Sequence, residues 1–149
     1  MLDNPQTNTV YFSSSPEETM GIGKTIASTL SAGDIVCMQG DLGAGKTTLA
    51  KGIISFLTHT PLEEIQSPTF VLLNLYTSSK APVCHFDLYR MDREKAFVQR
   101  GFLDYFDNHH LCLIEWPSKI PSFIPPYALH ITISHEGTLH RMITCKRGA

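Results

Sequence analysis

The chain has little net charge, few cysteines and no long apolar segment. Its 149 residues carry a formal net charge of −2, so no overall positive field would draw the protein to nucleic acid. The short basic end, Lys146-Arg147, is more typical of a solvated tail than of a nucleic-acid contact. No stretch approaches the roughly 18 consecutive apolar residues of a membrane-spanning helix, and residues 1–10 lack the basic and apolar regions of a signal peptide. We therefore expect a soluble, cytoplasmic protein that reaches any nucleic acid through a partner.

The cysteines are widely spaced, and none forms a C-x-x-C pair. They are Cys37, Cys84, Cys112 and Cys145. Each lies in an apolar run typical of a strand, where free cysteine behaves as a small hydrophobic residue. The histidines show no H-x-x-x-H spacing, and His109-His110 is interpreted as a solvated turn. The sequence therefore predicts structural cysteines and no zinc site.

The remaining composition is that of one globular domain over residues 1–149, with 42% apolar and 17% charged residues and no internal repeat. Predicted strands cover residues 9–12, 35–38, 70–76, 83–88, 111–114, 128–134 and 139–145, the last two as a hairpin around Glu136-Gly137. Predicted helices cover residues 16–30, 46–57 and 92–100, with a shorter helical turn at 102–106 and a proline-rich loop at 117–126. Strands that alternate with helices, followed by strands alone, indicate an α/β fold with a mixed parallel and antiparallel central sheet flanked by helices.

The first predicted helix has a clear start signal. Ser15 is the expected N-cap, Pro16 the first helical residue, and Glu18 the residue that reaches back in a capping box. Gly23-Lys24-Thr25 imitates part of a phosphate-binding motif, but Glu18 stands where its first glycine would be needed. We interpret that segment as ordinary helix.

A phosphate-binding loop follows the second predicted strand. Residues 40–47 read GDLGAGKT and match the P-loop (Walker A) pattern G-x-x-x-x-G-K-[ST]. The glycines let the backbone wrap a phosphate with its N–H groups inward, and the loop leads into a helix N-terminus that favours an anion. Lys46 is predicted to bind the β- and γ-phosphates of ATP, Thr47 the Mg²⁺ ion, and Thr48 the α-phosphate. The predicted nucleotide-binding residues are Leu42, Gly43, Ala44, Gly45, Lys46, Thr47 and Thr48.

Two acidic residues could complete the site from other strands, because a P-loop needs a carboxylate to hold Mg²⁺ or orient water. Glu115 follows an apolar strand, at the carboxyl end where ligands of α/β sheets collect. Asp87 lies in an alternating strand and could instead pair with Arg90 or Arg93; either acid could also be a structural ion-pair member. The predicted catalytic residues are Lys46, Asp87 and Glu115, and the predicted metal ligands are Thr47, Glu115 and Asp87.

Two further features near these acids have open interpretations. Trp116 could stack near the nucleotide or anchor its turn. Ser67-Pro68-Thr69-Phe70 lies where many P-loop proteins sense the γ-phosphate, but it could equally be an ordinary turn.

Four motifs in order resemble one family. They are GDLGAGKTT at residues 40–48, SPTF at 67–70, HFDLYR at 85–90 and IEWP at 114–117. Together they resemble TsaE, the small P-loop ATPase family of bacterial tRNA threonylcarbamoyladenosine synthesis. The likeness covers nearly the whole chain, including the closing strand pair with Arg141. Leu75, where members often have an acidic residue, and Gln66 before SPTF depart from the family pattern; the first weakens any claim to a third carboxylate.

The resemblance implies an ATPase that is weak alone and works with TsaB and TsaD. TsaD is the family partner that transfers the threonylcarbamoyl group to the adenosine beside the anticodon, so this chain would carry no transfer chemistry and its ATP cycle would reset the complex. The resemblance places Lys46 on phosphates, Thr47 and Glu115 on Mg²⁺, and Asp87 on metal or water. A small P-loop kinase of a metabolite or nucleotide is the alternative, although the chain offers no arginine-rich lid. A nucleotide-gated binding module without useful turnover is a third.

Overall fold

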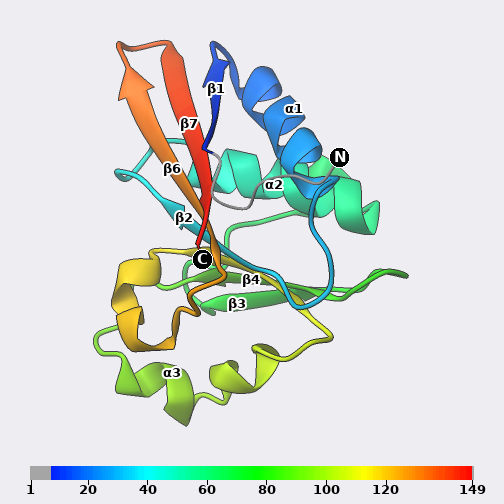
Figure 1. Ribbon diagram of the computed structural model, residues 1–149, viewed down its shortest axis with the longest axis vertical. Helices are drawn as coiled ribbons and strands as arrows, with labels where there is room; N and C mark the ends of the chain where they lie inside the picture. Colours follow the sequence, from blue (N-terminus) through cyan, green and yellow to red (C-terminus); the bar gives the residue numbers. More distant parts are fainter. Residues whose placement is uncertain (1–7, 149) are drawn as a thin grey trace.

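The computed structural model describes residues 8–148, which form seven strands in one sheet with helices on both faces (Figure 1). The strand order is β1-β7-β6-β2-β5-β4-β3. The strands are β1 (Thr9–Ser13), β2 (Ile35–Gln39), β3 (Leu73–Tyr76), β4 (Val83–Asp87), β5 (Leu111–Glu115), β6 (Leu129–Glu136) and β7 (His140–Arg147). The predicted fold class, an α/β domain with a mixed sheet, is confirmed. The absence of a signal segment concerned residues 1–10, of which residues 1–7 lie outside this description.

The centre of the sheet is parallel and its margins are antiparallel. β5 pairs in parallel with both β2 and β4, and β2 pairs in parallel with β6. The β6–β7 hairpin, β1 and β3 add antiparallel pairs at the two sides. Every residue of β4 and β5 is buried, as expected for strands that are covered on both faces. The carboxyl ends of β2, β4 and β5 therefore meet at one edge of the sheet.

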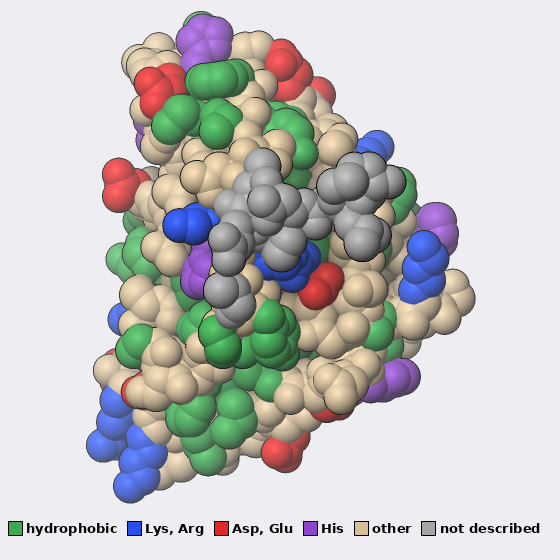
Figure 2. Space-filling model, viewed as in Figure 1, with side chains coloured by type: hydrophobic (Ala, Val, Ile, Leu, Met, Phe, Trp, Pro, Cys, Tyr) green, Lys and Arg blue, Asp and Glu red, His purple; other side chains and the backbone are tan. Residues whose placement is uncertain are grey.

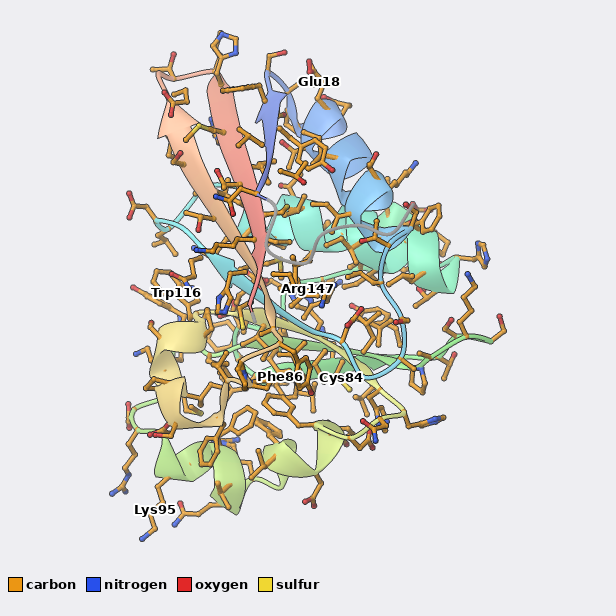
Figure 3. All side chains as sticks on the ribbon, in the orientation of Figure 1. Glu18, Cys84, Phe86, Lys95, Trp116 and Arg147 are labelled. Atoms are coloured by element: carbon orange, nitrogen blue, oxygen red, sulfur yellow. The ribbon has the colours of Figure 1, made fainter. Side chains whose placement is uncertain are left out.

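Two layers cover the sheet. The helices α1 (Pro16–Ala27) and α2 (Lys46–Thr58) lie on one face, while α3 (Lys95–Gln99) and the 3₁₀ turn Phe102–Tyr105 lie on the other (Figure 1). Alternation along β2 shows the division, because Val36 and Met38 join the α1–α2 core and Ile35 and Cys37 join the opposite one. The opposite core is aromatic, and Phe86, labelled in Figure 3, lies at its centre.

Helix α2 is held close to α1 by a glycine contact. A Cβ at Gly52 would lie 2.4 Å from the carbonyl oxygen of Met20, and one at Gly23 would lie 2.8 Å from that of Leu49. The two backbones can therefore approach only because both positions lack side chains. This contact fixes α2, whose first residue is Lys46.

Most predicted elements are confirmed, and four predictions are wrong in detail. The third strand begins at Leu73 rather than residue 70, because the amide of Leu72 donates to the carbonyl of Pro68 at 2.7 Å and closes a turn. The first helix ends at Ala27 rather than residue 30, and the predicted 92–100 helix is only Lys95–Gln99. The loop at 117–126 contains two 3₁₀ turns, Pro117–Lys119 and Pro121–Phe123.

At the start of α1 the predicted N-cap is confirmed and the predicted capping box is not. The side chain of Ser15 accepts a hydrogen bond from the amide of Glu18 at 3.0 Å, as an N-cap does. The carboxylate of Glu18 accepts from the hydroxyl of Ser14 instead of returning to Ser15, so the capping box is incomplete. Gly23-Lys24-Thr25 lies inside α1, which confirms that this segment is not a second phosphate loop.

The cysteines are buried, as their apolar surroundings in the sequence predict, and the surface carries charges of both signs. All four cysteines are buried and free, and each lies in a strand. Figure 2 shows Lys, Arg, Asp and Glu side chains interspersed over the visible face, with a basic corner near α3, where Lys95 is labelled in Figure 3. Over residues 8–148, no helix combines the length and apolar character needed to cross a bilayer.

Candidate functional site

The predicted phosphate loop joins the end of β2 to the start of α2. Gly43 and Gly45 adopt φ values of 81° and 110°, which disfavour residues with a Cβ. Gly40 is required for a different reason, because a Cβ there would lie 2.5 Å from the carbonyl oxygen of Ile133 in β6. Gly45 caps α2, so the loop ends at the free N–H groups of a 13-residue helix. The backbone is therefore shaped to receive an anion.

Lys46 lies in the interior of this loop. The residue is 5% exposed, and Nζ donates hydrogen bonds to the carbonyl oxygens of Gly40 and, at 3.1 Å, of Asp41. Nζ also lies 4.1 Å from the centre of the Trp116 ring. Burial lowers the pKa of Lys46, while the carboxylates of Glu115, Asp87 and Asp41 act in the opposite direction. A phosphate would therefore meet a preplaced cation whose hydrogen bonds go to backbone carbonyl oxygens.

Glu115 is the acidic residue from another strand that bonds the end of the loop. It ends β5, the strand between β2 and β4, opposite Met38 on one side and Asp87 on the other. The hydroxyl of Thr47 donates to its two carboxylate oxygens at 3.1 and 3.4 Å. The ring nitrogen Nε2 of His85 lies 2.6 Å from Oε2. The first residues of α2 and the end of β5 are thus connected through one carboxylate.

Asp87 is held by hydroxyl groups and not by an arginine. Ser67 and Thr69 donate to its Oδ2 at 3.1 and 3.4 Å, and the amide of Tyr89 donates to Oδ1 at 3.1 Å. The alternative pairing with Arg90 or Arg93 is not found among residues 8–148; the Arg90 guanidinium instead lies 4.5 Å from the centre of the Phe70 ring. The SPTF turn is therefore tied directly to the second carboxylate of the site.

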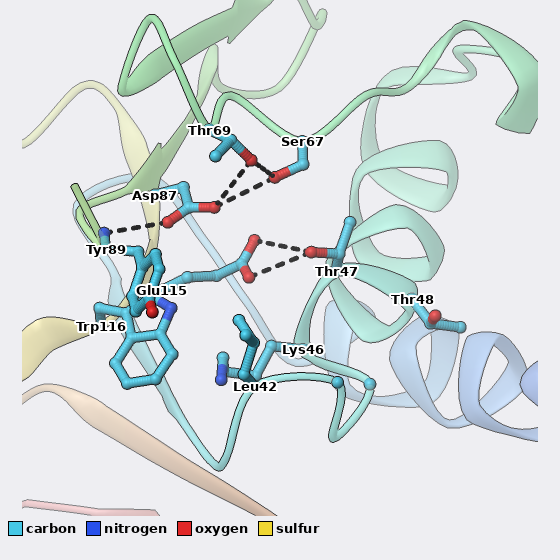
Figure 4. A pocket seen from close by; sticks show the side chains of 12 residues that line it. Leu42, Lys46, Thr47, Thr48, Ser67, Thr69, Asp87, Tyr89, Glu115 and Trp116 are labelled. Atoms are coloured by element: carbon cyan, nitrogen blue, oxygen red, sulfur yellow. Dashed lines mark hydrogen bonds between the residues drawn. The ribbon is translucent and has the colours of Figure 1, made fainter.

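These groups surround one open cavity of about 390 Å³ (Figure 4). Six of the seven predicted nucleotide-binding residues line it, together with both acidic residues, Ser67 and Thr69. The exception is Ala44, which is buried and whose carbonyl accepts a hydrogen bond from Nε of Arg141 at 3.0 Å. Thr48 lies apart from the Thr47–Glu115 pair in Figure 4, farther along α2.

Trp116 forms one wall of the cavity. Its backbone has a φ of 62°, a conformation that is uncommon for a bulky residue and that costs about 1 kcal/mol or more. Its ring packs on Tyr89 with centroids 4.9 Å apart and lies over Lys46. Both roles considered for Trp116, packing at the turn and a position beside the nucleotide cavity, are therefore compatible with its place.

The donor set suits a hard divalent cation such as Mg²⁺. Thr47, Glu115 and Asp87 all present oxygen, which is the ligand type that Mg²⁺ prefers. Among the described residues, no group of three or more His, Cys, Asp and Glu side chains could enclose a metal. Mg²⁺ usually binds through one or two carboxylates together with waters and substrate phosphates, so two carboxylates are sufficient.

Two residues of the site were missed in the sequence. His85 and Tyr89 flank Asp87, and only Asp87 was recognised there. The signal for His85 was present, since residues two apart in a strand point to the same face. Tyr89 belongs to the same alternation, with polar or aromatic residues at positions 85, 87 and 89, but it was assigned no role.

Comparisons with known proteins agree on one family. The family model "Threonylcarbamoyl adenosine biosynthesis protein TsaE" matches residues 13–143. The TsaE protein of Bacillus subtilis is 39% identical over 129 residues, covering 87% of this chain and 79% of its own length. That of Nostoc is 34% identical over 142 residues, covering 91% and 85%. The crystal structure of Bacillus subtilis YdiB superposes with a TM-score of 0.78 at 31% identity, covering 99% of this chain and 90% of its own.

The matched region spans the phosphate loop, both acidic residues and the hydroxyl-bearing turn, and the superposed structure extends over the whole sheet. This chain belongs to the TsaE family of tRNA threonylcarbamoyladenosine biosynthesis proteins.

Proposed function

We propose that this chain binds Mg-ATP in the cavity of Figure 4 and hydrolyses it weakly, as a cytoplasmic accessory ATPase of a TsaB–TsaD-type complex. The observation that supports this most is the convergence of Lys46, Thr47, Asp87 and Glu115 on one cavity at the carboxyl edge of the sheet. Those four residues come from three separate segments of the chain. A glycine-rich loop that bound no ligand would not require these four side chains to line the same cavity.

Each residue has a task that its position suits. The loop amides and Lys46 bind the phosphates, and the N-terminus of α2 adds its partial positive charge. Thr47 and Glu115 would hold Mg²⁺, which supplies charge neutralisation to the transferred phosphoryl group when it is bound. Asp87 would either complete the metal site or orient the attacking water. Ser67 and Thr69 hold the Asp87 carboxylate in place.

The same contacts offer a route from the nucleotide to a partner. Asp87 is bonded to Ser67 and Thr69, and the next residues, Phe70 and Val71, are 81% and 61% exposed. If nucleotide binding changes the hydrogen bonds of Asp87, the conformation of the turn changes, and with it the surface that Phe70 and Val71 present to a partner. Action on tRNA would then be indirect, through the partner that performs the transfer.

The test is ATP hydrolysis measured with and without purified TsaB and TsaD. We expect a slow rate for the chain alone, a rise of about tenfold or more with both partners, and loss of that rise in Glu115→Gln, because Glu115 would hold the Mg²⁺ that neutralises charge on the transferred phosphoryl group. Lys46→Ala should also lose hydrolysis, because Lys46 would bind the phosphates. Lys24→Ala, in the segment that imitates the motif, is the matched control for Lys46→Ala and should keep the rate of the unaltered chain. A rate that stays flat with the partners would refute the proposal, and labelled γ-phosphate appearing on a metabolite would favour a kinase.

A further inference from the structure

His85 is a fully buried polar residue that the proposed reaction does not use. It lies in β4, two residues before Asp87, so both side chains point to the face covered by α2. Val83 lies on the same face and joins the α1–α2 core. A histidine among these apolar neighbours must be compensated by a hydrogen bond.

That hydrogen bond is made to Glu115. Nε2 of His85 lies 2.6 Å from Oε2 of Glu115, and Thr47 donates to the same carboxylate from the start of α2. The carboxylate is therefore held from two elements, a helix and a neighbouring strand. Because a glutamate side chain has three rotatable bonds, two such contacts remove most of its freedom.

The contacts also indicate which ring nitrogen carries the proton. An ionised carboxylate only accepts hydrogen bonds, so Nε2 is the donor. The other nitrogen, Nδ1, is buried and is the one buried side-chain N or O atom without a partner among the described residues. A bare lone pair there avoids burying an unpaired N–H group, which assigns the Nε2–H form.

We propose that His85 is the positioning residue for Glu115, holding the carboxylate so that it meets Mg²⁺ beside Thr47. The inference rests on the proposed Mg-ATP function and adds a residue to it. Hydrogen bonds to a ligating carboxylate fix its direction, and their loss typically weakens metal binding about 10- to 100-fold. His85 itself touches neither phosphate nor metal in this arrangement, so it acts only through Glu115.

The test separates this role from simple core packing. His85→Leu removes the hydrogen bond and fills the space, whereas His85→Gln can carry an N–H donor to about the position of Nε2. Val83→Ala is the control, since it loosens the same face of the same strand at a position opposite Leu111, four residues before Glu115 in β5. Calorimetry measures the affinity for ADP in EDTA, and then for Mg²⁺ with ADP saturating.

We expect His85→Leu to bind Mg²⁺ about 10- to 100-fold more weakly, with Mg-free ADP affinity within about twofold of the unaltered chain. His85→Gln should recover most of the loss, and Val83→Ala should change neither affinity. Unchanged Mg²⁺ affinity in His85→Leu, or an equal fall in both affinities, would overturn the inference. If the unaltered chain binds no ADP, the proposed function itself fails, and the inference fails with it.

A second measurement needs neither nucleotide nor a folded leucine variant. Nitrogen-15 NMR of the histidine rings distinguishes the two ring positions of the proton, and His85→Gln identifies the signal of His85 by its disappearance. We expect a slowly exchanging proton on Nε2 whose shift changes in Glu115→Gln. A proton on Nδ1 would refute the arrangement.

Discussion

The closest contact between the two long helices offers a quantitative test of how α2 is placed. In Gly52→Ala, the new Cβ would lie 2.4 Å from the carbonyl oxygen of Met20 and 2.9 Å from its Cα, where ordinary contact begins at 3.4 Å. Both atoms are backbone, so no side chain can turn away. The helices must separate by about 1 Å, and such overpacking costs up to about 3 kcal/mol.

The change also has a favourable part. Alanine is better than glycine inside a helix by about 1 kcal/mol, which leaves a net loss of about 2 kcal/mol for Gly52→Ala. In a domain of this size the midpoint of thermal unfolding should fall by about 4–8 °C. Gly21→Ala in α1 is the matched control, because nothing lies within 4 Å of its Cβ. It should gain up to about 1 kcal/mol.

Thermal unfolding followed by circular dichroism measures both variants. We expect opposite signs, with Gly52→Ala less stable than the unaltered chain and Gly21→Ala slightly more stable. Gly52→Ala should also bind nucleotide more weakly, because the same helix begins at Lys46. A Gly52→Ala midpoint equal to or above that of the unaltered chain would refute the close-approach argument.

Two further predictions concern ionisable groups. Hydrogen bonds from the amides of His110 and His109 lower the pKa of Asp107 to about 2, so its stabilising effect is present above about pH 4 and is lost as pH falls toward 2. Asp107→Ala should therefore be less stable than the unaltered chain at pH 6, by no more than about 1 kcal/mol for so exposed a group, and the difference should be much smaller at pH 2, where the Asp107 carboxyl of the folded chain is about half protonated. Urea unfolding at both pH values measures this difference, and an equal difference at pH 6 and pH 2 would contradict the prediction. Burial raises the pKa of Cys37 to about 12 and that of Cys145 to about 11, so a thiol reagent at pH 8 should label none of the four cysteines in the folded chain and all four in denaturant. Rapid labelling of the folded chain would count against the buried assignment.

The sequence predicted the order of the elements because its signals are local. Apolar runs bounded by turn residues located the buried strands, and the glycine spacing located the phosphate loop. The 70–76 strand was misjudged because its apolar run begins inside the turn that the hydrogen bond between Leu72 and Pro68 closes. Apolar pattern alone cannot reveal a backbone turn that is stabilised by contacts to β4.

The site residues that a local sequence pattern marks were predicted. The contacts that depend on how distant segments pair in the sheet were missed. Glu115 was found because it follows a buried strand, and Asp87 because it is the carboxylate of an alternating strand. The bond between His85 and Glu115 joins residues 30 positions apart in neighbouring strands. The hydrogen bonds from Ser67 and Thr69 to Asp87 likewise join residues that are 20 and 18 positions apart in the sequence. A local sequence pattern does not reveal contacts between residues so far apart in the chain.

Nucleotide binding by the unaltered chain and by Lys46→Ala tests the central claim most directly. Titration calorimetry with ATP and ADP, with and without Mg²⁺, should show binding that Mg²⁺ strengthens. Lys46→Ala should weaken it about 10- to 100-fold, because a hydrogen bond to a charged group contributes about 1.5–3 kcal/mol. Lys24→Ala, an exposed lysine in the imitating segment, should bind as the unaltered chain does. Equal affinity in Lys46→Ala and the unaltered chain would contradict the account.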